Sequence, residues 1–470
     1  MTIRIYNTLS KKKEEIKPAR RKKINLFVCG PTVYDYSHLG HARNYIVFDV
    51  FVKYLRKAGF NVFYLQNITD LDDKIIARAR EKQVSPKDLA KAFEKEHLKD
   101  MKNLGINSVT KYARATDYIK EIISQIKRLQ TKGYAYKIEG DGIYYDISKF
   151  KKYGKLSGRT ALQAEDSVSR IDYSKNKRNR GDFCLWKFSA EAEPSWPSPF
   201  GKGRPGWHIE DTAITEKFFG PQYDIHGAAR DLIFPHHEAE ISQMEAISGK
   251  SPMAKYWMHV GFLTINGQKM SKSLGNFIII NDFLRRYPKN YLRFFVIKNL
   301  WRSPIDYSES VMIEVRAAVE KIEEFLGRLK EIKNPSAGSG QASRQIKKII
   351  KKAKEDFYKQ LDDDFNTPKA LAVLFNFIKT INKFLDKNLI SKKEAEKIYE
   401  FFEELNNIFG IINLKKIKVA IPAGIKKLAK ERERFRKEQK WQKADEVRME
   451  IEKQGFTVED TKSGPVIKKS

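Results

Sequence analysis

The sequence predicts an α/β fold with a parallel sheet, followed by a helical region and a small α+β unit. An apolar run at residues 24–28, ended by a Gly-Pro pair, predicts a buried strand. Apolar residues at helical spacing follow over 40–59, and 61–65 has the pattern of a second strand. This order of strand, helix and strand is the unit of a Rossmann-type parallel sheet. The second observation is that helical patterns dominate residues 345–409.

Length and charge indicate several domains and a polyanionic partner. A chain of 470 residues is too long for one core, so three or four domains are expected. Its 90 Lys and Arg residues exceed its 59 Asp and Glu residues, and the resulting charge of +31 favours binding to nucleic acid. A generally basic cytosolic protein is the alternative, because the cations are spread along much of the chain.

Cysteine content and hydropathy indicate the compartment. Only Cys29 and Cys184 are present, too few for a disulfide framework, so a reducing cytoplasm is expected. Cys184 lies among large apolar residues and is expected to be a buried core thiol. No stretch approaches the roughly 20 apolar residues of a membrane helix, and the basic residues 1–23 lack the apolar core of a signal peptide. We therefore expect a cytoplasmic protein with no membrane partner.

The remaining elements follow from the same patterns. Thr69 and Asp72 have the spacing of a capping box that opens a helix over 73–82, so Asp72 and Asp73 are expected to be caps rather than catalytic acids. Residues 362–368 are expected to be a helix junction capped by Asn366 and not a metal cluster. The other expected elements are a strand at 3–7, a helix at 117–132, a strand at 142–146, helices at 282–298 and 308–333, a flexible linker at 334–343, a basic helix at 430–453 and a terminal hairpin.

His38, Gly40 and His41 lie where the first predicted strand gives way to its helix. In a parallel sheet, ligands bind beyond the carboxyl ends of the strands, where a helix amino terminus offers free N–H groups to an anion. His38 and His41 are three residues apart and can face one phosphate, and Gly40 allows the backbone to approach it closely. A surface or core histidine pair is the alternative for this motif taken alone.

Lys269 and Lys272 lie in a second motif, the glycine-bounded segment 267–276. A mobile loop with two ammonium groups can close over a triphosphate and stabilise the charge that develops as pyrophosphate leaves. A solvated basic turn is the alternative. The two motifs together are far more specific than either one.

The pair of motifs resembles the nucleotide-binding signatures of class I aminoacyl-tRNA synthetases. Other motifs are similar in order and spacing to those of cysteinyl-tRNA synthetases, from about residue 5 to the C-terminus; they comprise residues 29–41, 67–74, 206–210, 224–227, 234–238 and 269–276. The resemblance implies ATP-dependent ligation of L-cysteine to tRNA(Cys) through a cysteinyl-adenylate, with release of AMP and pyrophosphate. It also implies Mg²⁺ with ATP, and we expect a monomer.

The resemblance also implies roles for individual residues. Those implied to be catalytic are His38, His41, Lys269 and Lys272, and Gly40 joins them in binding ATP. Those implied to bind the amino acid are Thr32, Thr69, Trp207 and His208. Ala228, Ala229 and Ala239 depart from the family's usual residues and leave the packing of the adenosine open.

A metal site is expected around His236 and Glu240, which are four residues apart on a helix that begins after Pro235. His237 has Ile241 four residues after it, so the face of the helix that carries His237 provides no second ligand. In the resembled family zinc is held by two cysteines, this His and this Glu, so Cys29, His236 and Glu240 match.

Asp211 stands where the family has its second cysteine. Aspartate keeps the charge of a thiolate and can bind zinc, but its oxygen lies farther from the backbone, so we expect either that the strand end that carries it shifts or that the carboxylate turns aside. The expected site is therefore Zn²⁺ on Cys29, Asp211, His236 and Glu240. The alternative is an empty site in which Asp211 or Glu210 pairs with another group.

With these assignments the expected domains are, in order, the first half of the Rossmann catalytic domain (1–109), a connective insertion (110–200), the second half with the metal site (201–265), the lysine loop with stem-contact helices (266–333), a linker (334–344), a helical tRNA-binding bundle (345–415) and an anticodon-recognition unit (416–470). Two rival functions stay open. One is a cysteine ligase acting on a small amine, which would lack the long C-terminal region. The other is a catalytically inactive RNA-binding paralogue, for which Asp211 would be a sign of decay.

Overall fold

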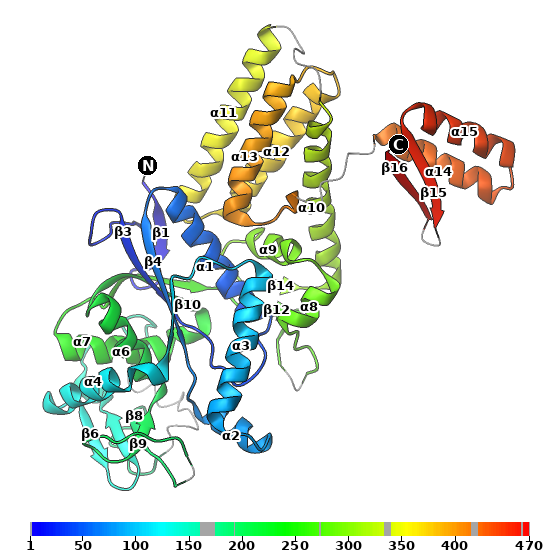
Figure 1. Cartoon of the computed structure of the whole chain (residues 1–470). Coiled ribbons are helices and arrows are strands. Elements are labelled where there is room, and N and C mark those ends of the chain that lie inside the picture. The colour runs from blue at the N-terminus through cyan, green and yellow to red at the C-terminus, as the bar shows by residue number, and fades with distance from the viewer. Residues whose placement is uncertain are drawn as a thin grey trace. The chain divides into compact units, whose positions relative to one another are not determined.

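The computed structural model describes residues 2–159, 174–191, 193–271, 274–332, 340–414, 422–461 and 464–469 (Figure 1). It divides into two compact units. The first comprises Met1–Val315, Glu355–Val373 and Leu405–Ile411, and the second comprises Arg316–Lys354, Leu374–Glu404 and Ile412–Ser470. Among the described residues, no helix is both long enough and apolar enough to cross a bilayer.

A five-stranded, all-parallel sheet forms the centre of the first unit. In spatial order its strands are β11 (Ala254–Val260), β10 (Tyr223–Ala229), β3 (Lys23–Val28), β4 (Asn61–Ile68) and β5 (Lys111–Arg114). The order reverses between β3 and β10, and ligands bind at such switch points. The predicted strand, helix and strand are confirmed as β3, α1 (Leu39–Lys57) and β4, although β4 continues beyond the expected residue 65.

Helices cover both faces of this sheet (Figure 1). On one face α1 packs so closely that a Cβ on Gly227 of β10 would overlap the ring of Phe48. The other face is covered by α6 (Trp207–Phe219) and α7 (His236–Ser248). A buried ion pair joins α1 to α9 (Lys289–Ile297): Arg293 donates to Asp49 at 2.8 Å, and Asp49 also binds Lys53 at 2.8 Å.

An antiparallel sheet separates the two halves of the parallel sheet in sequence. Its strands are β6 (Ala135–Ile138), β7 (Gly142–Tyr145), β8 (Phe183–Phe188) and β9 (Gly203–Pro205), and it is preceded by α4 (Ile119–Thr131). Cys184 is buried on β8, as expected. The expected limits of 110–200 are wrong at both ends, because β5 pairs with β4 and β9 pairs with β8. The polar strand β5 and the three-residue β9 carry little apolar pattern from which they could be recognised.

The N-terminal hairpin consists of β1 (Arg4–Asn7) and β2 (Lys12–Glu15), and two helices, α2 (Asp73–Glu81) and α3 (Pro86–Leu104), follow β4. Asp72 caps α2 by accepting the N–H of Lys74 at 2.8 Å, as expected. The rest of the expected capping box is wrong. The Thr69 hydroxyl donates to Glu210, and Asp73 pairs with Arg204.

A small sheet carries the first lysine of the lysine motif. It contains β12 (Leu263–Ile265), β13 (Gln268–Lys269) and β14 (Ile305–Tyr307). The expected single helix over 282–298 is two helices, α8 (Ile280–Arg286) and α9, because Pro288 cannot continue a helix from Tyr287. Lys272 lies outside the described residues.

The helical region is α10 (Glu309–Lys330), α11 (Gly340–Asp362), α12 (Thr367–Leu385) and α13 (Lys392–Phe409). α11 begins within the expected linker, and residues 333–339 lie outside the described part of the chain. The helix junction after α11 is confirmed: Asn366 accepts the N–H of Lys369 at 3.2 Å. Asp364 at this junction accepts the N–H of Tyr6 at 2.8 Å and pairs with Arg302 at 2.9 Å. Its carboxylate therefore has a structural role, in holding the junction to these two residues.

The C-terminal residues form α14 (Ala423–Lys437), α15 (Trp441–Lys453), β15 (Phe456–Thr461) and β16 (Gly464–Lys469). The hairpin is confirmed, but the expected single helix over 430–453 is wrong. Gln439 has a positive φ of 56°, which breaks the helix and turns the chain back. The two helices and the hairpin enclose a small core of Ile425, Ala429, Ile451, Phe456 and Val458.

Candidate functional site

A cavity of about 680 Å³ opens at the carboxyl ends of β3, β4 and β10. Among the residues that line it are Cys29, Thr32, His38, Gly40, His41, Thr69, Trp207, Asp211, His236 and Lys269. The structure therefore brings most of the expected site residues to one cavity. Glu240 and His208 lie behind its wall, buried at 0% and 4% exposure.

His38 and His41 cap α1 reciprocally. His38 Nδ1 accepts the N–H of Gly40 at 3.1 Å, and His41 Nδ1 accepts the N–H of His38 at 3.3 Å. The rings stack with centroids 3.9 Å apart. Burial, and then the neighbouring His38 and His97, hold the pKa of His41 well below its usual value, so its ring is neutral. A neutral ring that accepts at Nδ1 carries its proton on Nε2, which leaves Nε2–H as a donor.

The segment around the lysine motif is tied to the start of α1. Leu39 donates its N–H to the carbonyl of Ile278 at 3.1 Å. Asn276 closes the motif by accepting the N–H of Ser271 at 2.7 Å and donating to the carbonyl of Lys269 at 3.2 Å. Lys269 is exposed and lies at the rim of the cavity, where an ammonium group can reach a bound anion.

Thr32 and Thr69 form an isolated parallel bridge just beyond the ends of β3 and β4. Thr69 donates its N–H to the carbonyl of Pro31 at 3.1 Å, and its hydroxyl donates to Glu210. Trp207 stacks on His236 with ring centroids 4.3 Å apart. His208 was expected to line the cavity, but it does not. Its Nδ1 instead lies 2.8 Å from Nδ1 of His236, so it supports that ring from behind.

The expected metal ligands converge beneath the cavity. Ligand atoms of Cys29, Asp211, His236 and Glu240 all lie within 4.8 Å of one another. His236 Nε2 is 3.1 Å from Asp211 Oδ2 and 3.0 Å from Glu240 Oε1. Among the described residues no well-aligned hydrogen-bond donor reaches either oxygen of Glu240 or Oδ1 of Asp211, although all these atoms are buried. A cation would satisfy these oxygens, so the set fits Zn²⁺.

The electrostatics of this cluster also favour a cation. Burial, followed by the charges of Asp211 and Glu240, raises the pKa of Cys29, and burial raises that of Glu240. Burial lowers the pKa of His236, but Glu240 and Asp211 outweigh it and raise this pKa to about 10. The raised pKa values mean that these side chains hold their protons more tightly than usual, because the cluster would otherwise carry buried negative charge. A divalent cation can take the place of those protons.

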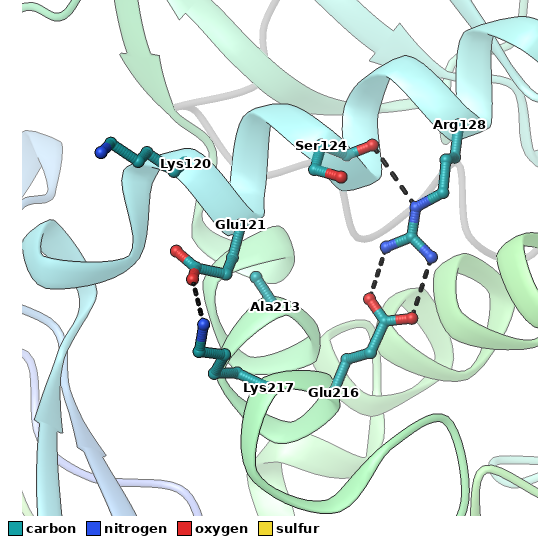
Figure 2. Close-up of a pocket in the computed structure, with 7 residues that line it drawn as sticks. All are labelled: Lys120, Glu121, Ser124, Arg128, Ala213, Glu216 and Lys217. Atoms are coloured by element: carbon teal, nitrogen blue, oxygen red, sulfur yellow. Dashed lines mark hydrogen bonds and ion pairs between the residues drawn. The ribbon is translucent and has the colours of Figure 1, made fainter.

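Asp211 lies on a helix, α6, and not at the end of a strand as expected. The helix places its carboxylate beside His236 without a shifted strand, because α6 and α7 pack against each other. Figure 2 shows how α6 is fixed to α4: Glu216 binds Arg128 through two parallel hydrogen bonds, and Lys217 pairs with Glu121 at 2.9 Å. Glu210 faces Thr69 instead of the metal ligands.

Two further histidines belong to the cluster and were not expected as ligands. His226 Nε2 lies 3.4 Å from Cys29 Sγ, and His237 Nε2 lies 3.3 Å from the same sulfur. The helical spacing that excluded His237 considers only partners on its own helix, whereas Cys29 follows β3 and His226 lies on β10. Pairing of β10 with β3 places His226 level with Phe27, two residues before Cys29, and hence on the same face of the sheet.

The three alanines that depart from the family's pattern lie in different surroundings. Ala239 is fully buried in the apolar core between α4, α6, α7 and the antiparallel sheet. Ala228 is fully buried in the core on the α6 and α7 face of the parallel sheet. Only Ala229 lines the cavity, so it alone among them is placed to affect ligand packing directly.

Comparison with known proteins covers the whole chain. The family described as tRNA synthetases class I (C) catalytic domain matches residues 15–317, the DALR domain matches 356–413, and the cysteinyl-tRNA ligase anticodon binding domain matches 418–464. A cysteine–tRNA ligase of Thermococcus gammatolerans is 44% identical over 479 residues, covering 100% of this chain and 99% of the relative. One from Thermodesulfovibrio yellowstonii is 43% identical over 477 residues, covering 97% and 98%.

Solved structures share the fold at low identity. A methionyl-tRNA synthetase of Mycobacterium tuberculosis with methionyl-adenylate has a TM-score of 0.61 at 15% identity, covering 82% of this chain and 90% of that one. A leucyl-tRNA synthetase of Agrobacterium radiobacter in a ternary complex has a TM-score of 0.63 at 10% identity, covering 84% and 85%. The class I synthetase fold expected from the sequence is confirmed, and the chain belongs to the cysteine–tRNA ligase family.

Proposed function

We propose that this chain joins L-cysteine to tRNA(Cys) in two steps, through a cysteinyl-adenylate, with consumption of ATP and release of AMP and pyrophosphate. The observation that carries the proposal is that one cavity has His38, His41 and Lys269 on its wall together with Cys29, Asp211 and His236. Nucleotide and amino acid can therefore lie side by side, which is what attack of a carboxylate on the α-phosphate requires.

In the first step, the protein positions the triphosphate and stabilises its developing charge. The Nε2–H groups of His38 and His41 would donate to phosphate oxygens, and the amino terminus of α1 adds its free N–H groups. Lys269, and Lys272 with it, would neutralise the departing pyrophosphate alongside the Mg²⁺ that accompanies ATP. These are electrostatic roles, so no residue needs to act as a covalent nucleophile.

Recognition of cysteine is proposed to rest on the metal cluster. Cys29, Asp211, His236 and Glu240 would hold Zn²⁺ at the base of the cavity, and a zinc ion there binds a thiolate far better than a serine hydroxyl. Trp207 packs on His236 and limits the space available to the side chain of the substrate. A site built around one specific polar contact can discriminate by about 10⁴ to 10⁵ without editing.

Binding of tRNA is proposed for the helical region and for residues 423–469. The match of 418–464 to an anticodon binding domain supports this assignment and weighs against a ligase for small amines, which has no use for such a domain. The net charge of +31 is consistent with an RNA partner. We propose that the protein acts as a monomer in the cytoplasm.

Pyrophosphate exchange into ATP, driven by cysteine and compared with serine, tests the first step. Charging of tRNA(Cys) then tests the second. Exchange with cysteine but no charging would favour the small-amine ligase. Absence of exchange in zinc-loaded protein would favour the inactive RNA-binding paralogue.

A further inference from the structure

A second set of possible metal ligands overlaps the first. We call Cys29, Asp211, His236 and Glu240 the outer set, and Cys29, His226, His237 and Glu240 the inner set. Three members of the outer set line the cavity, whereas Cys29 is the only member of the inner set that does so. His226, His237 and Glu240 are completely buried, at 0% exposure. An ion in the inner set would therefore be shielded from the cavity.

The inner imidazoles are oriented as metal ligands usually are. In metal sites the second ring nitrogen of a ligating histidine is held by another hydrogen-bonding group. His226 Nδ1 lies 2.7 Å from the hydroxyl of Tyr223, and His237 Nδ1 lies 2.8 Å from Nε2 of His259. His259 is in turn held by the hydroxyl of Thr8 at 2.8 Å. In the tautomer that carries its proton on Nδ1, each of His226 and His237 directs an Nε2 lone pair at Cys29.

The distances agree with tetrahedral zinc. Bonds of about 2.3 Å to sulfur and about 2.0–2.1 Å to nitrogen, at a tetrahedral angle, separate the two ligand atoms by about 3.5 Å. The observed Sγ–Nε2 separations are 3.4 Å for His226 and 3.3 Å for His237. Glu240 Oε1 lies 3.9 Å from His237 Nε2, and neither of its oxygens accepts a well-aligned hydrogen bond among the described residues. Its Oε1 also pairs with His236 Nε2 at 3.0 Å and its Oε2 lies 3.6 Å from His226 Nδ1, so completing the inner set requires the carboxylate to exchange its pair with His236 for the ion.

Charge and ligand softness also favour the inner set. One thiolate, one carboxylate and two neutral imidazoles balance the charge of Zn²⁺, whereas the outer set supplies three anions and leaves a net negative charge to be buried. Asp211 provides a carboxylate oxygen where the family has a thiolate sulfur. The outer set is therefore made of harder, less polarisable ligands than the usual site of the family. Nitrogen and sulfur are better zinc ligands than a second carboxylate.

We propose that, when no amino acid is bound, this chain holds Zn²⁺ in the inner set of Cys29, His226, His237 and Glu240. The proposal concerns metal retention by the free protein and does not depend on the ligase activity. It assigns to His226 and His237 the role of direct ligands. Because Cys29 and Glu240 belong to both sets, one ion occupies one set at a time.

Two neighbouring residues on α7 provide a matched test. His236→Asn and His237→Asn each remove an Nε2 ligand and keep an acceptor or donor near the position of Nδ1. Full-length protein is loaded with zinc alone, dialysed without cysteine and titrated with a chelating dye. We expect His237→Asn and His226→Asn to bind zinc at least about 10-fold more weakly, as for loss of a group that supports the metal. His236→Asn and Asp211→Asn should bind it as the parent protein does.

Loss of zinc from His236→Asn or Asp211→Asn, or full retention by His237→Asn, would overturn the proposal. Far-UV circular dichroism shows whether each variant folds. If a variant does not fold, the anomalous zinc signal in a crystal of the parent protein without cysteine decides the question. The proposal requires an ion bonded to Nε2 of both His226 and His237, and an ion bonded to His236 and Asp211 would refute it.

Discussion

His41 can be tested with two substitutions that separate its two nitrogens. Its Nδ1 accepts the N–H of His38 at the start of α1, and its Nε2–H is free to donate into the cavity. Asparagine places an acceptor near the position of Nδ1 but has nothing at Nε2. Glutamine places an amide N–H near Nε2 and loses the cap. His41→Asn therefore removes the proposed phosphate donor, and His41→Gln removes the structural bond.

The expected magnitudes differ between rate and stability. Loss of one preorganised donor to a developing anion costs about 10²–10³ in kcat, or about 2.7–4 kcal/mol, and we expect this of His41→Asn in adenylate formation. Loss of a helix cap costs about 1 kcal/mol of stability, and we expect this of His41→Gln, with kcat reduced by less than about 10-fold. The pKa of His41 is held well below its usual value, so its donor should persist in mildly acidic solution and kcat should not follow the titration of an ordinary histidine.

The assay is pyrophosphate exchange at saturating ATP and cysteine, combined with thermal unfolding of each variant. Equal losses of kcat in the two variants would refute the reasoning, because they would mean that His41 acts only by shaping the helix terminus. A larger loss in His41→Gln would contradict the assignment of the proton to Nε2.

Three other perturbations test separate parts of the structure. Lys269→Met should lower kcat for pyrophosphate exchange by about 10²–10³ and change the KM for ATP little, since the charge it neutralises develops in the transition state; a change confined to KM would contradict this. Asp49→Asn leaves Arg293 buried without its ion-pair partner and should destabilise the first unit by about 3–5 kcal/mol in urea unfolding. A loss below about 1 kcal/mol would show that other groups compensate for the missing carboxylate. Burial raises the pKa of Asp49, but Arg293 and Lys53 outweigh it and hold this pKa below its usual value, so the stabilisation is present above about pH 3.9 and is lost as the pH falls through the folded pKa. Asp211→Cys gives the outer set a second sulfur and should draw the ion into that set, with tighter zinc binding in chelator competition, and an unchanged affinity would show that the side chain at position 211 does not reach the ion.

The sequence predicted those parts of the fold in which apolar residues form a continuous run or recur at regular spacing within one segment. Residues 24–65 contain a continuous apolar run and a long helical stripe, and β3, α1 and β4 follow from them directly. The strand β5 has only one buried residue, so nothing in its own pattern marks it, and its pairing with β4 is decided by the sheet. The break at Gln439 is similar, because a glutamine with positive φ carries none of the usual signals of a helix end.

The metal cluster shows why spacing along one element predicts only part of a site. His236 and Glu240 were predicted because both lie on one face of α7, and the same spacing argument dismissed His237 because Ile241 follows it by one turn. In the fold the partners of His237 come from other elements: Cys29 from the end of β3, His226 from β10 and His259 from β11. Three neighbouring parallel strands bring these residues under one helix, and this register exists only once β10 and β11 have paired beside β3. A ligand set that depends on strand order can therefore be recognised only when the topology is known, and the approach of His226 Nε2 and His237 Nε2 to Cys29 Sγ, at 3.4 and 3.3 Å, is the observation that identifies it here.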